Sequence, residues 1–269
     1  MIGAIIGDIV GSRFEFNNYR KKDFKFFTSD CFFTDDSIMS LAIAKAFMEC
    51  RKDYNDLQEK AIYYMQTIGR NYPNCGYGLK FFDWIFNNPK PYNSFGNGAA
   101  MRISAVGYVA KNIEEVKKLS YLVTSVSHNH EQGLKGAQAT AMAIYLAIHG
   151  KTKEEIREYI IKNYYNINFT IDEIRDSYEF NETCQNSVPQ ALQAFFESTN
   201  FEDAIRIAIS LGGDSDTIAA ICGSVAEAYY GIPEEIKKEA KKFLDKPLLK
   251  ILEDFEEKIE VGTFKGLCN

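Results

Sequence analysis

The chain of 269 residues has little of what nucleic-acid and membrane-binding proteins need. Lys and Arg number 31 against 37 Asp and Glu, which gives a net charge of -6. The densest basic stretch, Lys237 to Lys242, alternates with apolar positions and is typical of the solvated face of a helix. Because nucleic-acid backbones and anionic membranes are bound by clustered cations, we expect neither as a partner.

Cysteine and histidine are also scarce. The six cysteines lie far apart without a Cys-x-x-Cys pair, and there are only three histidines. A zinc cluster or a disulfide framework needs such residues at close spacing, so the composition favours a reduced, cytoplasmic setting. The apolar start from Ile2 to Val10 contains Asp8, lacks a basic leader and is too short to cross a bilayer. We therefore expect neither a signal peptide nor a membrane anchor.

No linker rich in Pro, Gly or Ser and no block of charge divides the chain. We expect one domain over residues 1–269, and the 46% of apolar residues is enough for a sizeable core. Apolar positions recur at helical spacing, and caps followed by an acid three residues later mark further helix starts. The sequence therefore predicts an all-α fold. These caps are Asn112 with Glu115, Thr152 with Glu155 and Asn200 with Asp203.

Two predicted helices begin with an unusual set of acids and hydroxyls. Gly212-Gly213-Asp214-Ser215-Asp216-Thr217 precedes an apolar face over 218–229, and Thr34-Asp35-Asp36-Ser37 precedes another over 38–46. One carboxylate at the positive end of a helix is ordinary capping. Two carboxylates with a hydroxyl resemble half of a site for a hard cation such as Mg²⁺. Because two such starts repel unless separated or bridged by cations, a bridging metal pair fits the pattern.

The first predicted helix carries Gly3, Gly7 and Gly11, which leave a bare stripe against which another helix can pack closely. The helix ends at Phe14-Glu15-Phe16. The carboxylate of Glu15 either reaches solvent or lies in a partly dry pocket that favours its protonated form and suits acid/base work. Residues 17–33 show no clear period and predict a loop able to cover a site.

A glycine-bearing loop, Ser94-Phe95-Gly96-Asn97-Gly98, leads into a helix predicted to begin at Ala99-Ala100-Met101-Arg102. Free N–H groups at such a start can cradle phosphate, although a tight turn with a glycine cap explains the loop equally well. Arg102 is either a phosphate partner or a structural ion-pair partner. His128 precedes the predicted helix over 131–149 and is either a phosphate or substrate contact or an ordinary core residue.

Five segments, in this order, make the chain resemble the ADP-ribosylglycohydrolase family nearly end to end. That family includes dinitrogenase reductase-activating glycohydrolase and the ADP-ribosyl-arginine and ADP-ribosyl-serine hydrolases. The resemblance implies one compact all-α, orthogonal multi-helix domain with two Mg²⁺ or Mn²⁺ ions at the base of an ADP-ribose cleft. The five segments are Gly7-Asp8 to Glu15, Phe33-Thr34-Asp35-Asp36-Ser37, Gly96-Asn97-Gly98-Ala99-Ala100-Met101-Arg102, Ser127-His128 and Gly212-Gly213-Asp214-Ser215-Asp216-Thr217.

The resemblance also implies roles for individual residues. Glu15 would be the mobile acid/base group and would act in catalysis with Asp35, Asp36 and Asp214. The metal ligands would be Thr34, Asp35, Asp36, Asp214, Asp216 and Thr217. The substrate contacts would be Gly76, Tyr77, Gly78, Ser94, Phe95, Gly96, Asn97, Gly98, Met101, His128 and Ser215.

The expected function is metal-dependent hydrolysis, by a monomer, of the bond between C1″ of ADP-ribose and an acceptor. The substrate would be an ADP-ribosylated protein side chain or another ADP-ribosyl conjugate, and the product free ADP-ribose. Two alternatives stay open: a catalytically silent ADP-ribose-binding or structural member, and a metal-dependent phosphohydrolase of a nucleotide diphosphate. The sequence leaves the acceptor open, and loops 17–33 and 163–186 are expected to select it.

Overall fold

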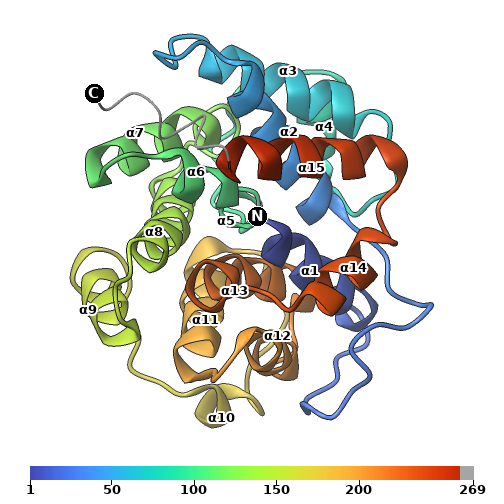
Figure 1. The fold of residues 1–269 in the computed structure, drawn as a ribbon, viewed down its shortest axis with the longest axis vertical. Coiled ribbons are helices and arrows are strands. Elements are labelled where there is room, and N and C mark those ends of the chain that lie inside the picture. The colour runs from blue at the N-terminus through green and yellow to red at the C-terminus, as the bar shows by residue number, and fades with distance from the viewer. Residues whose placement is uncertain (261–269) are drawn as a thin grey trace.

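The computed structural model describes residues 1–260, and these residues form an all-α fold (Figure 1). Within that range no strand forms, and an isolated antiparallel bridge joins Gly96 and Thr183. The predicted fold class is therefore confirmed. The helices, in chain order, are α1 (Ile2–Gly11), the 3₁₀ helix η1 (Ser12–Phe14), α2 (Asp35–Glu49), α3 (Leu57–Gly69), α4 (Leu79–Phe86), α5 (Gly98–Met101), α6 (Ser104–Val109), α7 (Ile113–Thr124), α8 (Glu131–Ile148), α9 (Lys153–Asn163), α10 (Ile171–Ile174), α11 (Cys184–Glu197), α12 (Phe201–Ser210), α13 (Ser215–Tyr230), α14 (Glu234–Lys241) and α15 (Lys246–Glu260).

Helices α1 and α13 pack with their backbones in contact, as the predicted glycine stripe requires. A Cβ atom on Gly7 would lie 2.1 Å from the carbonyl oxygen of Ala219, and one on Gly11 would lie 2.5 Å from Cα of Asp216. Gly3 likewise faces Gly223, so the two helices run antiparallel. The C-terminal end of α1 therefore lies beside the N-terminal end of α13, where the acids begin.

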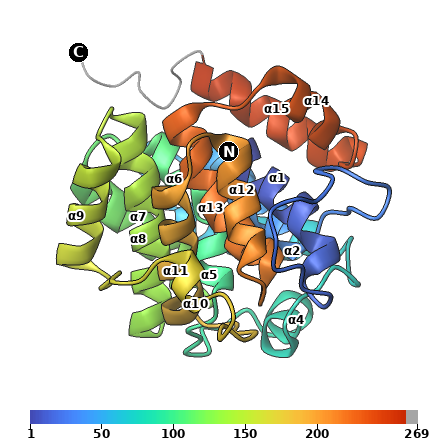
Figure 2. The ribbon, with the colours of Figure 1, turned by 90° about the horizontal axis from the view of Figure 1, so that it is seen from below.

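The remaining helices surround this pair. Helices α8, α11 and α12 pack on α13, whereas α2 packs on α1 and α3. Helix α15 lies across α2 (Figure 1). In Figure 2, α4 and its neighbouring loops lie on the side of the molecule opposite α14 and α15. Every residue of α1 is buried, including its only charged one, Asp8.

Several helix bounds differ from the predicted ones. The amphipathic pattern over 54–70 predicts a helix from about Tyr54, whereas α3 begins at Leu57, because Tyr54 adopts a left-handed backbone conformation with φ 60°. The sequence predicts a helix over 191–197, whereas α11 begins well before it, at Cys184, and accommodates Pro189 in its second turn. The helix predicted to begin at Ala99 is interrupted after α5, so Arg102 follows a short helix instead of opening a long one.

Two further expectations concern cysteine and the membrane. The five cysteines within residues 1–260 are free, and Cys268 lies outside the described residues. Among the described helices, none combines the length and the apolar character needed to span a bilayer.

Candidate functional site

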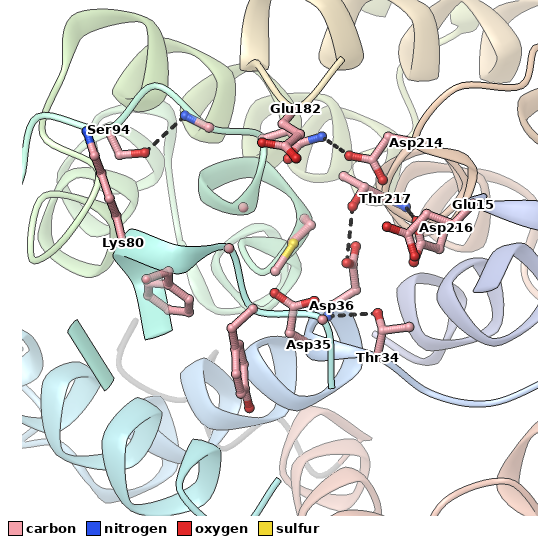
Figure 3. A pocket seen from close by; sticks show the side chains of 18 of the residues that line it. Glu15, Thr34, Asp35, Asp36, Lys80, Ser94, Glu182, Asp214, Asp216 and Thr217 are labelled. Carbon is pink, nitrogen blue, oxygen red and sulfur yellow. Dashed lines mark hydrogen bonds between the residues drawn. The ribbon is translucent and has the colours of Figure 1, made fainter. Parts of the chain in front are cut away.

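The N-terminal ends of α2 and α13, which carry the two sets of acids, face each other (Figure 3). Thr34 caps α2 by accepting a hydrogen bond from the backbone N–H of Asp36, and Asp214 holds the cap position of α13. The two starts are joined directly, because the Thr217 hydroxyl donates a 3.1 Å hydrogen bond to Oδ2 of Asp36. Residues 181 positions apart in the sequence thus form one site.

Carboxylate oxygens gather in two overlapping groups that could each hold a cation. One group is Asp8, Asp36 and Asp216, the other is Glu15, Asp214 and Asp216, and within each the oxygens lie within 4.8 Å of one another. Asp216 belongs to both groups, so the geometry offers two adjacent cation positions. Of the predicted ligands, Asp36, Asp214 and Asp216 belong to these groups, and Thr217 contacts Asp36. Thr34 and Asp35 line the same cavity but Asp35 belongs to neither group. The structure adds Asp8, which the sequence analysis did not include among the ligands.

Two observations test whether these residues suit a divalent ion. Oδ1 of Asp36 is buried and has no hydrogen-bond partner, an arrangement that is costly unless a cation completes it. Within residues 1–260, no Lys or Arg forms an ion pair with any acid of the two groups. Carboxylate and hydroxyl oxygens are the ligands that Mg²⁺ and Mn²⁺ prefer, so the donor set fits these ions.

Asp8 anchors the start of α2 to α1. Its carboxylate accepts hydrogen bonds from the N–H and hydroxyl of Thr34, at 2.9 and 2.7 Å, and from the N–H of Ser37 at 3.1 Å. The Ser37 hydroxyl also donates to it. Burial nevertheless raises the pKa of Asp8 to about 6. The signal that could have identified it was a single acid inside an otherwise apolar helix, because such a charge needs partners.

Burial and mutual repulsion perturb the other acids. Burial is the first cause that raises the pKa of Asp35, Asp36 and Asp216 well above the ordinary value, and the negative charge of neighbouring acids raises it further. Burial, followed by the charge of Asp214, raises the pKa of Glu15 to about 7. Without cations the site therefore retains protons at neutral pH, and bound cations would displace them.

Glu15 is half-buried, which fits the partly dry setting that the sequence left open, but its two aromatic neighbours in the chain differ in exposure. Phe14 is buried, whereas Phe16 is 86% exposed and stacks on Phe180. Glu15 follows η1 and lies outside the α-helices, so its backbone depends on other contacts for its position.

Asn18 supplies those contacts. Its side-chain N–H₂ donates to the carbonyl oxygens of Phe14, Glu15 and Gly213, at 2.9, 3.1 and 3.1 Å. Its side-chain oxygen accepts from the Gly213 N–H at 2.8 Å. Asn18 thus fastens the turn that bears Glu15 to the turn that precedes α13. Because these contacts join distant parts of the chain, no local pattern could have revealed them.

A cavity of about 610 Å³ opens above the acids (Figure 3). Its opposite wall is the glycine loop with His128, and the Gly76 turn closes one side. Gly76 has φ 95°, and a Cβ there would lie 3.0 Å from Oδ1 of Asp35, so the turn packs directly behind this acid. The predicted substrate contacts that line the cavity are Gly76, Tyr77, Gly78, Ser94, Gly96, Asn97, Gly98, Met101 and His128.

Two predicted substrate contacts lie elsewhere. Phe95 packs its ring 5.1 Å from that of His130, outside the cavity wall. Ser215 is fully buried in the first turn of α13 and donates to the Gly213 carbonyl. The sequence analysis, in turn, missed several lining residues that come from separate loops. These are Phe16, Leu79, Lys80, Phe81, Tyr92, Phe180 and Glu182.

Asn97 belongs to the glycine loop, but its side chain points toward the acids. Its side-chain amide donates to Oδ2 of Asp214 at 2.7 Å and to the Ser187 hydroxyl at 3.1 Å, and its N–H donates to the Glu182 carbonyl at 2.7 Å. These bonds orient Asp214. An anion at this wall of the cavity would therefore meet the glycines of the loop and the side chain of His128.

Comparison with known proteins agrees with this geometry. A family model described as ADP-ribosylglycohydrolase matches residues 1–262, and the chain belongs to this family. ADP-ribosylhydrolase ARH3 of Gallus gallus is 24% identical over 260 residues, which cover 74% of this chain and 70% of that protein. ADP-ribosylarginine hydrolase Tri1 of Pseudomonas putida (strain GB-1) is 25% identical over 274 residues, covering 89% and 73%.

The fold has a solved counterpart. A structure described as an ADP-ribosylglycohydrolase-related protein complex superposes with a TM-score of 0.68 and covers 95% of each chain at 19% identity. At this identity the likeness concerns the arrangement of helices alone.

Proposed function

We propose that this protein is a metal-dependent hydrolase that cleaves the glycosidic bond between C1″ of ADP-ribose and an acceptor, such as a protein side chain, and releases ADP-ribose. The observation that carries the proposal is the meeting of two carboxylate groups around Asp216 at the base of a cavity walled by a glycine loop. Family membership and the names of the two relatives support the same chemistry.

Two Mg²⁺ or Mn²⁺ ions would be held by acids and hydroxyls of both helix starts. Bound there, such ions supply Lewis-acid polarisation of a ribose hydroxyl and of water. Asp8 keeps the α2 ligands in place through its bonds to Thr34 and Ser37, and Asn97 does the same for Asp214. The ligands would be Thr34, Asp35, Asp36, Asp214, Asp216 and Thr217.

Glu15 would move the proton. Cleavage at C1″ needs a proton for the leaving group and a base for the attacking water. In the metal-free site, burial and the charge of Asp214 raise the pKa of Glu15 to about 7. Glu15 is only half-buried and lies outside the α-helices, so it is the acid of the site best able to hold or accept that proton. The glycine loop and His128 would bind the diphosphate, and the acceptor would lie near Phe16 and Phe180, two exposed rings that line the cavity.

We further propose that residues 1–269 form one domain that works as a monomer in the cytoplasm. The family match over residues 1–262 and the continuous hydrophobic cluster from Met1 to Phe255 support one domain. The free cysteines of the described part support a reducing compartment.

Defined ADP-ribosyl conjugates test the function. The protein, with Mg²⁺ or Mn²⁺, is incubated with arginine-, serine- and O-acetyl-linked ADP-ribose, and the products are separated. We expect free ADP-ribose from at least one conjugate, and loss of release with a chelator or with Asp216→Asn. The exposed Asp53→Asn, in the turn between α2 and α3, is the matched control and should keep full activity. Release of AMP would favour the phosphohydrolase alternative, and binding without product the silent one.

A further inference from the structure

Arg102 is a buried cation without an acidic partner. It is 1% exposed, lies between α5 and α6, and forms no ion pair within residues 1–260. Its guanidinium carbon lies 5.1 Å from the ring centroid of Phe81, and two of its nitrogens, Nε and Nη1, have no hydrogen-bond partner. Because burying an uncompensated charge is costly, this arrangement needs a counter-charge or a function.

The third nitrogen of the guanidinium reaches a serine–histidine pair. Nη2 of Arg102 donates to Oγ of Ser127 at 2.7 Å and lies 3.3 Å from Nδ1 of His128. Oγ of Ser127 lies 2.9 Å from the same Nδ1. A guanidinium only donates hydrogen bonds, so it needs an acceptor at Nδ1, and the Ser127 hydroxyl can direct its own proton there. These contacts place the ring proton of a neutral His128 on Nε2.

Nε2 of His128 lies on the cavity side of the ring. A Cβ atom added to Gly96 or to Gly98 would lie 3.5 Å from this nitrogen, so it sits against both glycines of the loop. His128 lines the cavity although it is only 4% exposed. The proton on Nε2 therefore faces the place where an anion would approach the loop.

We propose that Arg102 and Ser127 are positioning residues that hold His128 in the neutral Nε2–H tautomer, so that it presents a hydrogen-bond donor to a phosphate group at the glycine loop. Arg102 also supplies the positive charge behind this donor, and the bound phosphate is its missing counter-charge. The identity of the phosphate as part of an ADP-ribosyl group rests on the proposed function. The tautomer of His128 is independent of that function.

The surroundings of His128 agree with a neutral ring. Burial, and then the positive charge of Arg102, lower the pKa of His128 well below its ordinary value. The rings of Phe81 and Tyr92 flank it at 5.9 and 5.7 Å between centroids, and no carboxylate among residues 1–260 hydrogen-bonds to it. A neutral ring keeps Nδ1 as an acceptor for Arg102 and Ser127, which an imidazolium could not offer because both of its nitrogens carry protons.

Nitrogen-15 NMR tests the tautomer in the protein without ligand. The chain has only three histidines, and His149 is an internal control because its Nδ1 lies 2.7 Å from the Tyr145 carbonyl and must carry the proton there. His130→Gln and His149→Gln assign the signals. We expect the Nε2–H pattern for His128 from pH 6 to 8 and a mixture of tautomers in Ser127→Ala and Arg102→Lys. An Nδ1–H pattern or a charged ring at pH 7 in the wild type would overturn the proposal.

Titration with ADP-ribose tests the role in binding. Loss of a charge-assisted hydrogen bond weakens binding by about 10- to 100-fold, which is the effect expected for Arg102→Lys, with a smaller effect for Ser127→Ala. Circular dichroism confirms that the variants fold. Unchanged affinity in both variants, with His128 shifted between tautomers, would refute the binding role. If the wild type binds no ADP-ribose, the proposed function fails while the NMR result still decides the tautomer.

Discussion

Replacing Asp36 by Asn should stabilise the metal-free protein and weaken its response to divalent ions. One carboxylate oxygen each of Asp8, Asp36 and Asp216 lies within 4.8 Å of the others. Two unit charges at that separation repel by about 3.5 kcal/mol at an effective dielectric constant of about 20. The substitution removes two of the three repulsive carboxylate pairs. The Thr217 hydroxyl can still donate its hydrogen bond, to the amide oxygen of the new side chain.

The measurable gain is smaller than the repulsion itself, because the metal-free acids already retain protons. We expect the free energy of unfolding to increase by about 1 kcal/mol, which raises Tm by about 2–4 °C for a chain of this size. For the wild type, an ion at 100 times its Kd adds about 2.7 kcal/mol per site, or about 5–10 °C. In Asp36→Asn most of that increase should disappear.

Thermal melts at pH 8, with a chelator and then with increasing Mg²⁺ or Mn²⁺, measure both effects. Asp176→Asn makes the same chemical change at an exposed position and should follow the wild type in both conditions. A variant that melts below the wild type in chelator, yet keeps the full metal-induced increase, would show that Asp36 is a structural acid and that the repulsion argument is wrong.

Three further predictions concern the helix contact, the Glu15 turn and pH. Gly7→Ala, whose Cβ would lie 2.1 Å from a backbone oxygen, should lower stability by about 1–3 kcal/mol or more in urea melts, whereas Gly78→Ala, with open space around its Cβ, should not. Asn18→Ala should lower turnover by about tenfold with unchanged circular dichroism, because it frees the turn that bears Glu15. Equal turnover would show that another contact holds the turn. Since burial raises the pKa of Asp8 to about 6 and of Glu15 to about 7, the metal-free protein should be most stable below about pH 4 and lose stability as pH rises toward 7. Saturating Mg²⁺ should suppress that loss. Thermal melts from pH 4 to 8, with and without the ion, measure it, and a metal-free Tm that rises with pH would contradict the prediction.

The acidic starts of α2 and α13 could be predicted from sequence because helix capping is local chemistry. Thr34 caps α2 as its position suggests, and the glycines of α1 predict a close helix contact without naming the partner. The charges alone allowed the two starts to be either separated or bridged by cations, and the family resemblance implied that they meet around a metal pair. The geometry of the pair, such as the bond from Thr217 to Asp36, depends on how α1 and α13 cross.

What the sequence could not predict consists of side chains whose partners are distant. Asp8 binds the start of α2, Asn18 binds the turn before α13, and Arg102 binds the turn after α7, and none of these pairs has a regular spacing. Arg102 shows the difficulty most clearly. Its sequence context predicted a helix start and left a phosphate or an acid as its partner, whereas it follows a short helix, has no acidic partner among residues 1–260, and contacts Ser127 and His128.

The contact between α1 and α13 explains why the site combines a fixed part and an adjustable part. Because Gly11 admits Cα of Asp216 so closely, the end of α1 lies beside the acids of α13, and Asp8, one turn earlier, fastens the start of α2 to the same place. The predicted metal ligands are thus carried by the starts of two buried helices, which suits groups that must keep a fixed geometry. Glu15 lies just beyond η1, where Asn18 holds its backbone while its half-buried side chain, outside the α-helices, keeps rotational freedom. A group that must hold a proton at one stage and accept one at another benefits from that freedom, and this is why we assign proton transfer to Glu15 and not to a buried aspartate.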